Sequence, residues 1–156
     1  MTTVSLVEAP AAIQSYASGS GRPVILLDGG SGAGKTSLAA RVAASWRATR
    51  GEELQVVSLD DVYPGWDGLA AGSAAVTRIL AGSNAGYRRW DWDRSRPAAW
   101  VSVDPHRPIL VEGCGALTVA SAPARVGHMA TAIARLQALA AEPVEATAPQ
   151  AEASAS

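Results

Sequence analysis

The sequence is short of several residue types that mark particular classes of protein. Its single cysteine, Cys114, excludes an internal disulfide framework, and its two distant histidines, His106 and His128, offer no credible zinc cluster. This cysteine usage suits a reducing compartment, and we expect a cytoplasmic protein. No run approaches the roughly 18 apolar residues of a membrane-spanning helix, and the N-terminus lacks the basic and apolar segments of a signal peptide.

Strong charge of either sign is also missing. The formal net charge is −1 at pH 7 and the isoelectric point is near 6.1, so we expect neither nucleic acid nor a membrane surface as a partner. Any anion must therefore be bound by a local group of residues. Lysine is nearly absent, because all 13 basic residues except Lys35 are arginines.

The pattern of apolar residues predicts one globular domain of the α/β class. The chain has 156 residues, of which 48% are hydrophobic, enough for a single domain with a buried core. Short apolar runs predict parallel strands at Val24–Leu27, Leu54–Leu59 and Ile109–Val111. Helical spacing of apolar residues predicts helices over Thr36–Arg50 and Leu69–Leu80.

A glycine-rich loop joins the first strand to the first long helix, and it matches the pattern G-x-x-x-x-G-K-[ST] in full. Its residues are Gly29, Gly30, Ser31, Gly32, Ala33, Gly34, Lys35 and Thr36, with Ser37 next. The glycines let backbone N–H groups and the positive end of the following helix meet a phosphate chain. We expect Lys35 to reach the β- and γ-phosphates of ATP and the Thr36 hydroxyl to hold Mg²⁺. The fold expected is therefore the three-layer αβα fold of the P-loop NTPases.

Other glycine motifs do not fit the spacing. A dinucleotide-binding G-x-G-x-x-G would need glycine at Ser31 or Lys35, and a nucleophile elbow centred on Ser31 would need glycine at Ala33. The chain also lacks the Asn-Lys-x-Asp motif of a GTPase and the Leu-Ser-Gly-Gly signature of a transporter ATPase.

Acidic residues stand at the carboxyl end of each expected strand. Asp28 precedes the P-loop, Asp60 and Asp61 follow the second strand, and Glu112 follows the third. Ligands of open α/β sheets bind beyond these strand ends, so we expect the carboxylates to converge there. Either Asp60 or Asp61 is a candidate general base, the alternative being a solvated turn. Glu112 is a candidate metal-side carboxylate in the Walker B position, the alternative being a strand-end charge.

Residues 82–107 alternate aromatic, arginine and aspartate residues in neither a helical nor a strand period, so we expect a loop with one helical turn around Pro97–Val101. The flat faces of its aromatic residues suit a planar acceptor, and its arginines offer anion contacts. The alternative is that the tryptophans pack a loop against the sheet. The residues concerned are Tyr87, Trp90 and Trp92, with Arg88, Arg89, Arg94 and Arg96.

Four segments taken together resemble the uridine kinase and phosphoribulokinase branch of the P-loop kinases, over about residues 22–116. The segments are Leu27–Ser37, Ser58–Tyr63, Trp90–Trp92 followed by Arg96, and Leu110–Gly113. The P-loop alone is shared by many NTPases. The D-x-x-Y step after the second strand, combined with the aromatic-Asp-aromatic segment, narrows the resemblance to this branch.

The resemblance implies a role for each matching residue. Asp60 aligns with the catalytic aspartate, which activates the acceptor hydroxyl and lies near the metal. Tyr63 aligns with an aromatic residue that contacts a nucleobase, and Trp90 and Trp92 align with the aromatic pair of the acceptor site. Arg96 belongs to the same acceptor segment.

At the metal, the resemblance implies that Thr36 supplies the hydroxyl and Glu112 the metal-side glutamate. The acceptor implied is a small molecule with a hydroxyl group, and uridine is the nearest guess. Tryptophans stand where the family has smaller aromatics, which leaves the identity of the acceptor open.

The resemblance ends after Gly113, because the arginine-rich lid and the later strands of the family are not recognisable in residues 117–156. This stretch is rich in alanine, contains two arginines, Arg125 and Arg135, and shows helical spacing only near Val126–Ala141. We expect a sheet truncated to about three strands in the order 2-3-1. The P-loop strand would then be an exposed edge that a second copy of the chain could cover.

The expected organisation has three parts: an N-terminal helix and linker over 1–21, a kinase-like core over 22–116, and an alanine-rich helical or disordered tail over 117–156. Two functions fit this organisation. One is a kinase that transfers the γ-phosphate of ATP to a small-molecule hydroxyl. The other is a truncated module that binds ATP without efficient transfer, because a P-loop kinase needs closure around the transferring phosphoryl group.

Overall fold

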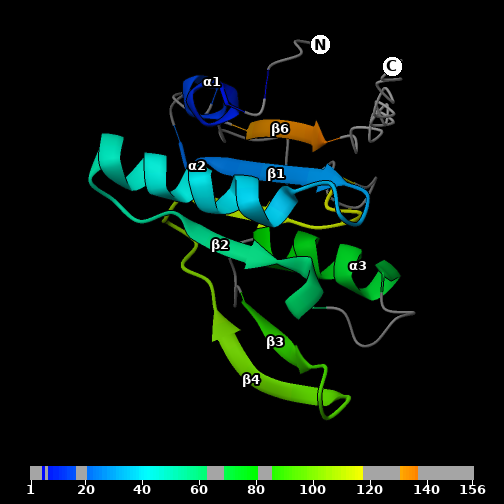
Figure 1. The fold of residues 1–156 in the computed structure, drawn as a ribbon. Helices are drawn as coiled ribbons and strands as arrows, with labels where there is room; N and C mark the ends of the chain where they lie inside the picture. The colour runs from blue at the N-terminus through cyan, green and yellow to red at the C-terminus, as the bar shows by residue number, and fades with distance from the viewer. Residues whose placement is uncertain are drawn as a thin grey trace, which may run out of the picture.

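The computed structural model describes residues 5, 7–16, 21–62, 69–80, 86–117 and 131–136, and its elements are drawn in Figure 1. The helices are α1 (Ala9–Tyr16), α2 (Lys35–Arg50) and α3 (Leu69–Leu80), with a 3₁₀ turn η1 at Leu59–Asp61. The strands are β1 (Val24–Gly29), β2 (Gln55–Ser58), β3 (Gly86–Asp91), β4 (Arg96–Ser102), β5 (Ile109–Glu112) and β6 (Thr131–Leu136). Within these residues, no helix has both the length and the apolar character to cross a membrane.

A parallel sheet in the order β2-β5-β1-β6 forms the centre of the fold. The three strands expected from the sequence are present, and their order, β2-β5-β1, is the 2-3-1 order expected. β1 and β5 are apolar runs because their side chains are covered on both faces of the sheet, whereas β2 is an edge strand with Val57 buried and Val56 exposed. The α/β fold class is confirmed.

Two hydrophobic clusters cover the two faces of this sheet. Alternate side chains of β1 point to opposite faces, so Val24 and Leu26 pack with the α3 residues Val76 and Ile79. On the other face, Ile25 and Leu27 pack with α1 and α2 through a set that includes Ile13, Leu38, Val42 and Trp46. Figure 1 shows α2 and α3 on opposite sides of the sheet, which gives the three layers of an αβα fold.

β6 lies where the sequence indicated a helix. Thr131–Leu136 pairs in parallel with β1 over six residues, so the helix expected over Val126–Ala141 is wrong at this point. Alanine favours a helix locally, but pairing with the apolar edge of β1 overrides that preference. The P-loop strand is therefore not an exposed edge, although the expected second copy of the chain stays a prediction. The other residues of the 117–156 tail, apart from Leu117, lie outside the described part of the chain.

An antiparallel hairpin of β3 and β4 forms a second, two-stranded sheet, which extends beneath the parallel sheet in Figure 1. The loop expected over residues 82–107 is wrong here, and Pro97–Val101 is a strand rather than a helical turn. Most side chains of β4 are exposed on both faces, so the strand lacks the alternation that identifies a half-buried strand. A register shift between Arg88 and Trp90 further breaks the pattern.

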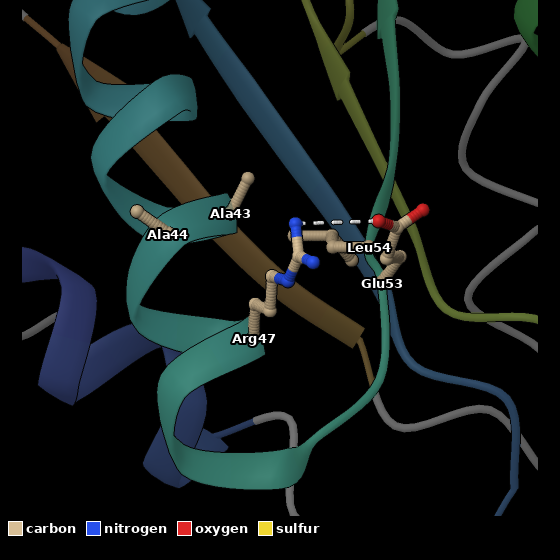
Figure 2. A pocket seen from close by; sticks show the side chains of 5 residues that line it. All are labelled: Ala43, Ala44, Arg47, Glu53 and Leu54. Atoms are coloured by element: carbon tan, nitrogen blue, oxygen red, sulfur yellow. Dashed lines mark ion pairs between the residues drawn. The ribbon is translucent and has the colours of Figure 1, made fainter.

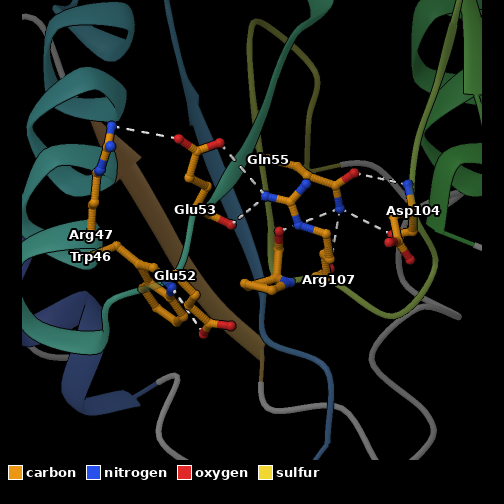
Figure 3. Close-up of polar contacts among 8 residues, drawn as sticks. Trp46, Arg47, Glu52, Glu53, Gln55, Asp104 and Arg107 are labelled. Carbon is orange, nitrogen blue, oxygen red and sulfur yellow. Dashed lines mark hydrogen bonds and ion pairs between the residues drawn. The ribbon is translucent and has the colours of Figure 1, made fainter.

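A polar network links the amino ends of β2 and β5, at the end of the sheet away from the P-loop (Figure 3). The Gln55 amide donates to the backbone oxygens of Asp104 and Arg107 and accepts from the Asp104 N–H at 2.8 Å. Glu53 lies 3.5 Å from Arg47 and 3.9 Å from Arg107. The ion pairs are exposed and add little to stability, so the amide-to-backbone bonds are the main polar ties of this loop.

Gly113 gives the clearest test of the packing next to the site. A Cβ atom at this position would lie 2.5 Å from the Cβ atom of Leu59, which belongs to the buried core and cannot swing away. We expect Gly113→Ala to lower the free energy of unfolding by about 1–3 kcal/mol, the usual cost of overpacking. The midpoint of urea unfolding measures this change.

Gly51→Ala is the matched control for this prediction. Gly113 and Gly51 both have a positive φ, of 153° and 68°, but a Cβ atom at Gly51 would meet nothing within 4 Å. A Gly51→Ala change in unfolding free energy as large as that of Gly113→Ala would contradict the packing explanation.

Candidate functional site

The P-loop backbone curves between β1 and the first turn of α2. Gly32 and Gly34 have φ values of 75° and 84°, in the left-handed region that glycine adopts most readily. The Ala33 N–H donates to the Gly30 carbonyl, which closes the turn. Because no side chain caps the N-terminus of α2, its first N–H groups are available to an anion. Cβ atoms placed on Gly30, Gly32 or Gly34 would enter open space, so there is room beside the loop.

Lys35 is buried within this loop, with 8% of its surface exposed. Its Nζ donates to the Gly30 carbonyl at 2.8 Å and lies 3.7 Å from the Cys114 sulfur. Burial of an ammonium group is unfavourable unless it is hydrogen-bonded, and these two contacts supply the partners. The charge of Lys35 is thus held next to the turn that the glycines form.

Thr36 and Glu112 bring the P-loop and the end of β5 into contact. The Thr36 hydroxyl donates to Glu112 Oε1 at 3.1 Å, and Glu112 is 2% exposed. A hydroxyl and a buried carboxylate are oxygen ligands of the kind that Mg²⁺ prefers, so these residues fit a magnesium ion. In the described part of the chain, no group of three or more His, Cys, Asp or Glu side chains is placed to hold a metal without a ligand's help.

The strand register brings the predicted carboxylates to one end of the sheet. Glu112 lies opposite Leu27 of β1 on one side and Ser58 of β2 on the other. Asp28 follows Leu27 and η1 follows Ser58, so both begin at the same level of the sheet as the end of β5. This convergence was expected from the sequence. It does not by itself assign a role to each carboxylate.

The two neighbouring aspartates of η1 have different surroundings. Asp61 is half-buried and forms an ion pair with Arg89 at 3.2 Å. Asp60 is exposed, and the described residues provide no hydrogen-bonding or ion-pair partner for its carboxylate. A general base must be free to take a proton, so Asp60 suits that role better than Asp61.

The hairpin places the aromatic segment beside η1. The indole N–H of Trp92 donates to the backbone oxygen of Asp60 at 2.8 Å, and Trp92 is 38% exposed. A hollow of about 380 Å³ lies here, within the range of small-molecule sites. Its lining residues are Asp61, Arg89, Trp90, Asp91, Trp92, Asp93, Ala98 and Ala99.

The remaining predicted acceptor residues are placed differently. Arg96 is exposed on β4 opposite Asp91 and does not line the hollow. Tyr63 lies outside the described residues. Hydrogen bonds from Arg94 hold the pKa of Asp91 below its usual value, which keeps this carboxylate ionised beside the hollow.

A second hollow, of about 230 Å³, lies between α2 and the start of β2 (Figure 2). Ala43, Ala44, Arg47, Glu53 and Leu54 line it, and the Arg47–Glu53 ion pair crosses it. It lies at the amino ends of the strands, away from the P-loop, and is therefore not a candidate for the same site.

Two contacts beside the P-loop, made by Cys114 and Gly115, were not indicated by the sequence motifs. The Cys114 sulfur donates to the Gly29 carbonyl at 3.2 Å, and Asp28 Oδ1 accepts from the N–H groups of Gly29 and Gly115. The position of Asp28 at a strand end pointed to the site. No local pattern indicated that its partner would be the loop after β5.

No family model and no curated protein matches the sequence, but the fold is similar to solved structures. The chain is similar to a protein described as a possible uridine kinase from Bacillus stearothermophilus, with a TM-score of 0.60 and 20% identity over 76% of this chain and 74% of that one. A second similar structure, from Silicibacter sp. TM1040, is described as a fructose transport system kinase, an assignment marked as provisional. Its TM-score is 0.46, with 20% identity over 72% of this chain and 64% of that one. The chain has the P-loop kinase fold.

Proposed function

We propose that this protein binds ATP with Mg²⁺ and transfers the γ-phosphate to a hydroxyl group of a small molecule, with a nucleoside such as uridine as the nearest guess. The observation that carries the proposal is the contact of Thr36 in a complete P-loop with the buried carboxylate of Glu112, beside an aromatic hollow. The resemblance to uridine kinases supports the choice of acceptor.

Nucleotide binding would use the backbone of Gly29–Gly34 and the first turn of α2. Their N–H groups meet the phosphate oxygens, and Ser37 stands in the same first turn. Lys35 would exchange its contact with the Gly30 carbonyl for the β- and γ-phosphates. Because Lys35 is already buried at the loop, little side-chain freedom remains to be lost on binding.

Thr36 and Glu112 would hold the metal, with Asp60 nearby. Mg²⁺ bound there neutralises charge on the β- and γ-phosphates. Glu112 is held by its burial in the sheet and by the Thr36 hydroxyl, which fix the position of its carboxylate beside the P-loop.

Asp60 would act as the general base. It accepts the proton of the acceptor hydroxyl as the new oxygen–phosphorus bond forms, and the bond between the β–γ bridging oxygen and the γ-phosphorus breaks to release ADP. Trp92 holds the η1 backbone at this residue, and Trp90 and Trp92 present ring surface in the adjacent hollow. Tyr63 and Arg96 complete the proposed acceptor-binding set.

The second candidate is a module that binds ATP without efficient transfer. It is favoured by the scarcity of cationic residues after Glu112, since Arg125 and Arg135 are the basic residues of 117–156. Closure of arginines over the phosphates contributes strongly to transfer in this fold.

Replacement of Lys35 tests nucleotide binding. We expect Lys35→Ala to weaken the affinity for Mg·ATP by about 10- to 100-fold, because charge-assisted contacts to the phosphates are lost. Isothermal titration calorimetry measures the dissociation constants. Arg41→Ala is the matched control, since Arg41 is an exposed cation on the same helix that contacts the backbone oxygen of Val7 instead. Unchanged affinity in Lys35→Ala would refute the proposed binding mode.

Replacement of Asp60 tests phosphoryl transfer. With a panel of nucleosides and sugars, we expect ATP consumption stimulated by one acceptor, and a loss of about 10²- to 10⁴-fold in kcat for Asp60→Asn with ATP affinity retained. A coupled assay for ADP measures both. Asp104→Asn is the control, because Asp104 lies at the other end of the sheet and Asn keeps the oxygen that accepts the His106 N–H.

The panel also separates the two candidate functions. ATP binding with no stimulation by any acceptor would favour the binding module. Equal losses in Asp60→Asn and Asp61→Asn would contradict the choice of Asp60 as the base.

A further inference from the structure

The segment that follows β1 and the segment that follows β5 lie side by side next to the P-loop. We call their contacts the Asp28 clasp; it joins Leu27–Gly29 to Gly113–Gly115. The Gly113 N–H donates to the Leu27 carbonyl at 3.1 Å, and the Gly115 N–H donates to Asp28 Oδ1 at 2.9 Å. The Cys114 thiol donates to the Gly29 carbonyl at 3.2 Å.

Asp28 is the one side-chain carboxylate in this clasp. Its Oδ1 accepts two backbone N–H groups, from Gly29 at 2.9 Å within the P-loop and from Gly115 in the segment after β5. The two bonds share one oxygen atom. Without this oxygen, two backbone N–H groups would lose their acceptor, so Asp28 contributes to holding the two segments together.

The clasp lies between the two groups that must cooperate in the proposed reaction. On one side it holds the first residues of the P-loop, and on the other it continues directly into Glu112 of β5. It also contains Cys114, whose sulfur lies 3.7 Å from Lys35 Nζ. A displacement of one segment would therefore move Lys35 and Glu112 relative to each other, and small misplacements of this kind lower rates substantially.

We propose that Asp28 is a positioning residue, which acts through its two backbone hydrogen bonds rather than through its charge on metal or substrate. It aligns the P-loop with Glu112. The proposal rests on the proposed function only for its kinetic consequence. The clasp itself consists of contacts within the chain, so it can be tested without nucleotide.

Asparagine separates the two ways in which Asp28 could act. Its side-chain carbonyl can occupy the place of Oδ1 and accept both N–H groups, whereas it carries no charge. Alanine removes both bonds and leaves two backbone donors without their acceptor. A metal ligand or a base at this position would fail in both variants, and a positioning residue fails only in Asp28→Ala.

The single cysteine of the chain reports on the clasp directly. Cys114 is the one thiol, so 5,5′-dithiobis(2-nitrobenzoic acid) labels this residue alone. Without nucleotide, we expect the labelling rate to rise about tenfold in Asp28→Ala, the factor given by the loss of about one hydrogen bond's net contribution between the two segments, and to stay within about twofold of wild type in Asp28→Asn. Circular dichroism checks that each variant is folded.

Nucleotide affinity and turnover are measured on the same proteins. We expect the Mg·ATP affinity and kcat of Asp28→Asn to stay within about threefold of wild type and both quantities to fall about tenfold in Asp28→Ala. Fast labelling or lost turnover in Asp28→Asn would overturn the proposal, and so would an Asp28→Ala variant that behaves as wild type. If Asp28→Ala does not fold, the result for Asp28→Asn still decides the question.

Failure of the proposed function would look different from failure of this inference. A wild-type protein that binds no ATP would refute the proposed function, while the labelling rates of the three proteins would still show whether Asp28 holds the clasp.

Discussion

The parallel pairing of β1 with β5 is the constraint on which the arrangement of the site depends. It sets Leu27 opposite Glu112, so that the P-loop leaves one strand at the level where a buried carboxylate ends the other. Pairing of β5 with β2 places η1 in the same row. The side chains of the site are polar, but their relative positions follow from the strands beneath them, and the burial of β1 and β5 on both faces fixes the register of that pair.

Sequence patterns predicted those parts of the fold that depend on local chemistry. A continuous apolar run indicates a strand that is buried on both faces of a sheet, and apolar residues at helical spacing indicate a helix. The P-loop has a fixed pattern of glycines around Lys35. The predicted strands β1, β2 and β5 and helices α2 and α3 therefore agree with the structure within a few residues. The proximity of Thr36 to Glu112 followed from the rule that ligands gather at the carboxyl ends of parallel strands.

Features that depend on a distant partner could not be predicted in the same way. Four of the six residues of β6 (Ala132, Ala134, Arg135 and Leu136) favour a helix in isolation, and the segment becomes a strand because β1 offers an apolar edge for pairing. β4 is exposed on both faces and has no period to detect. The contact of Asp28 with Gly115 joins residues far apart in the chain, and only the three-dimensional fold brings them together. The different surroundings of Asp60 and Asp61 likewise depend on Arg89, which the hairpin supplies.

The position of β1 between β5 and β6 also bears on how the chain folds. Val24 finds its partners at Ile109 and Thr131, both far along the chain, and none of its neighbours in the sheet is local in sequence. Such non-local pairing carries a high cost in loop-closure entropy and slows folding. During synthesis, β1 leaves the ribosome long before either partner exists, so the sheet that flanks the phosphate-binding loop cannot form until β5 and β6 have been made. The P-loop is encoded early in the chain, and the strands on either side of its own strand are encoded late.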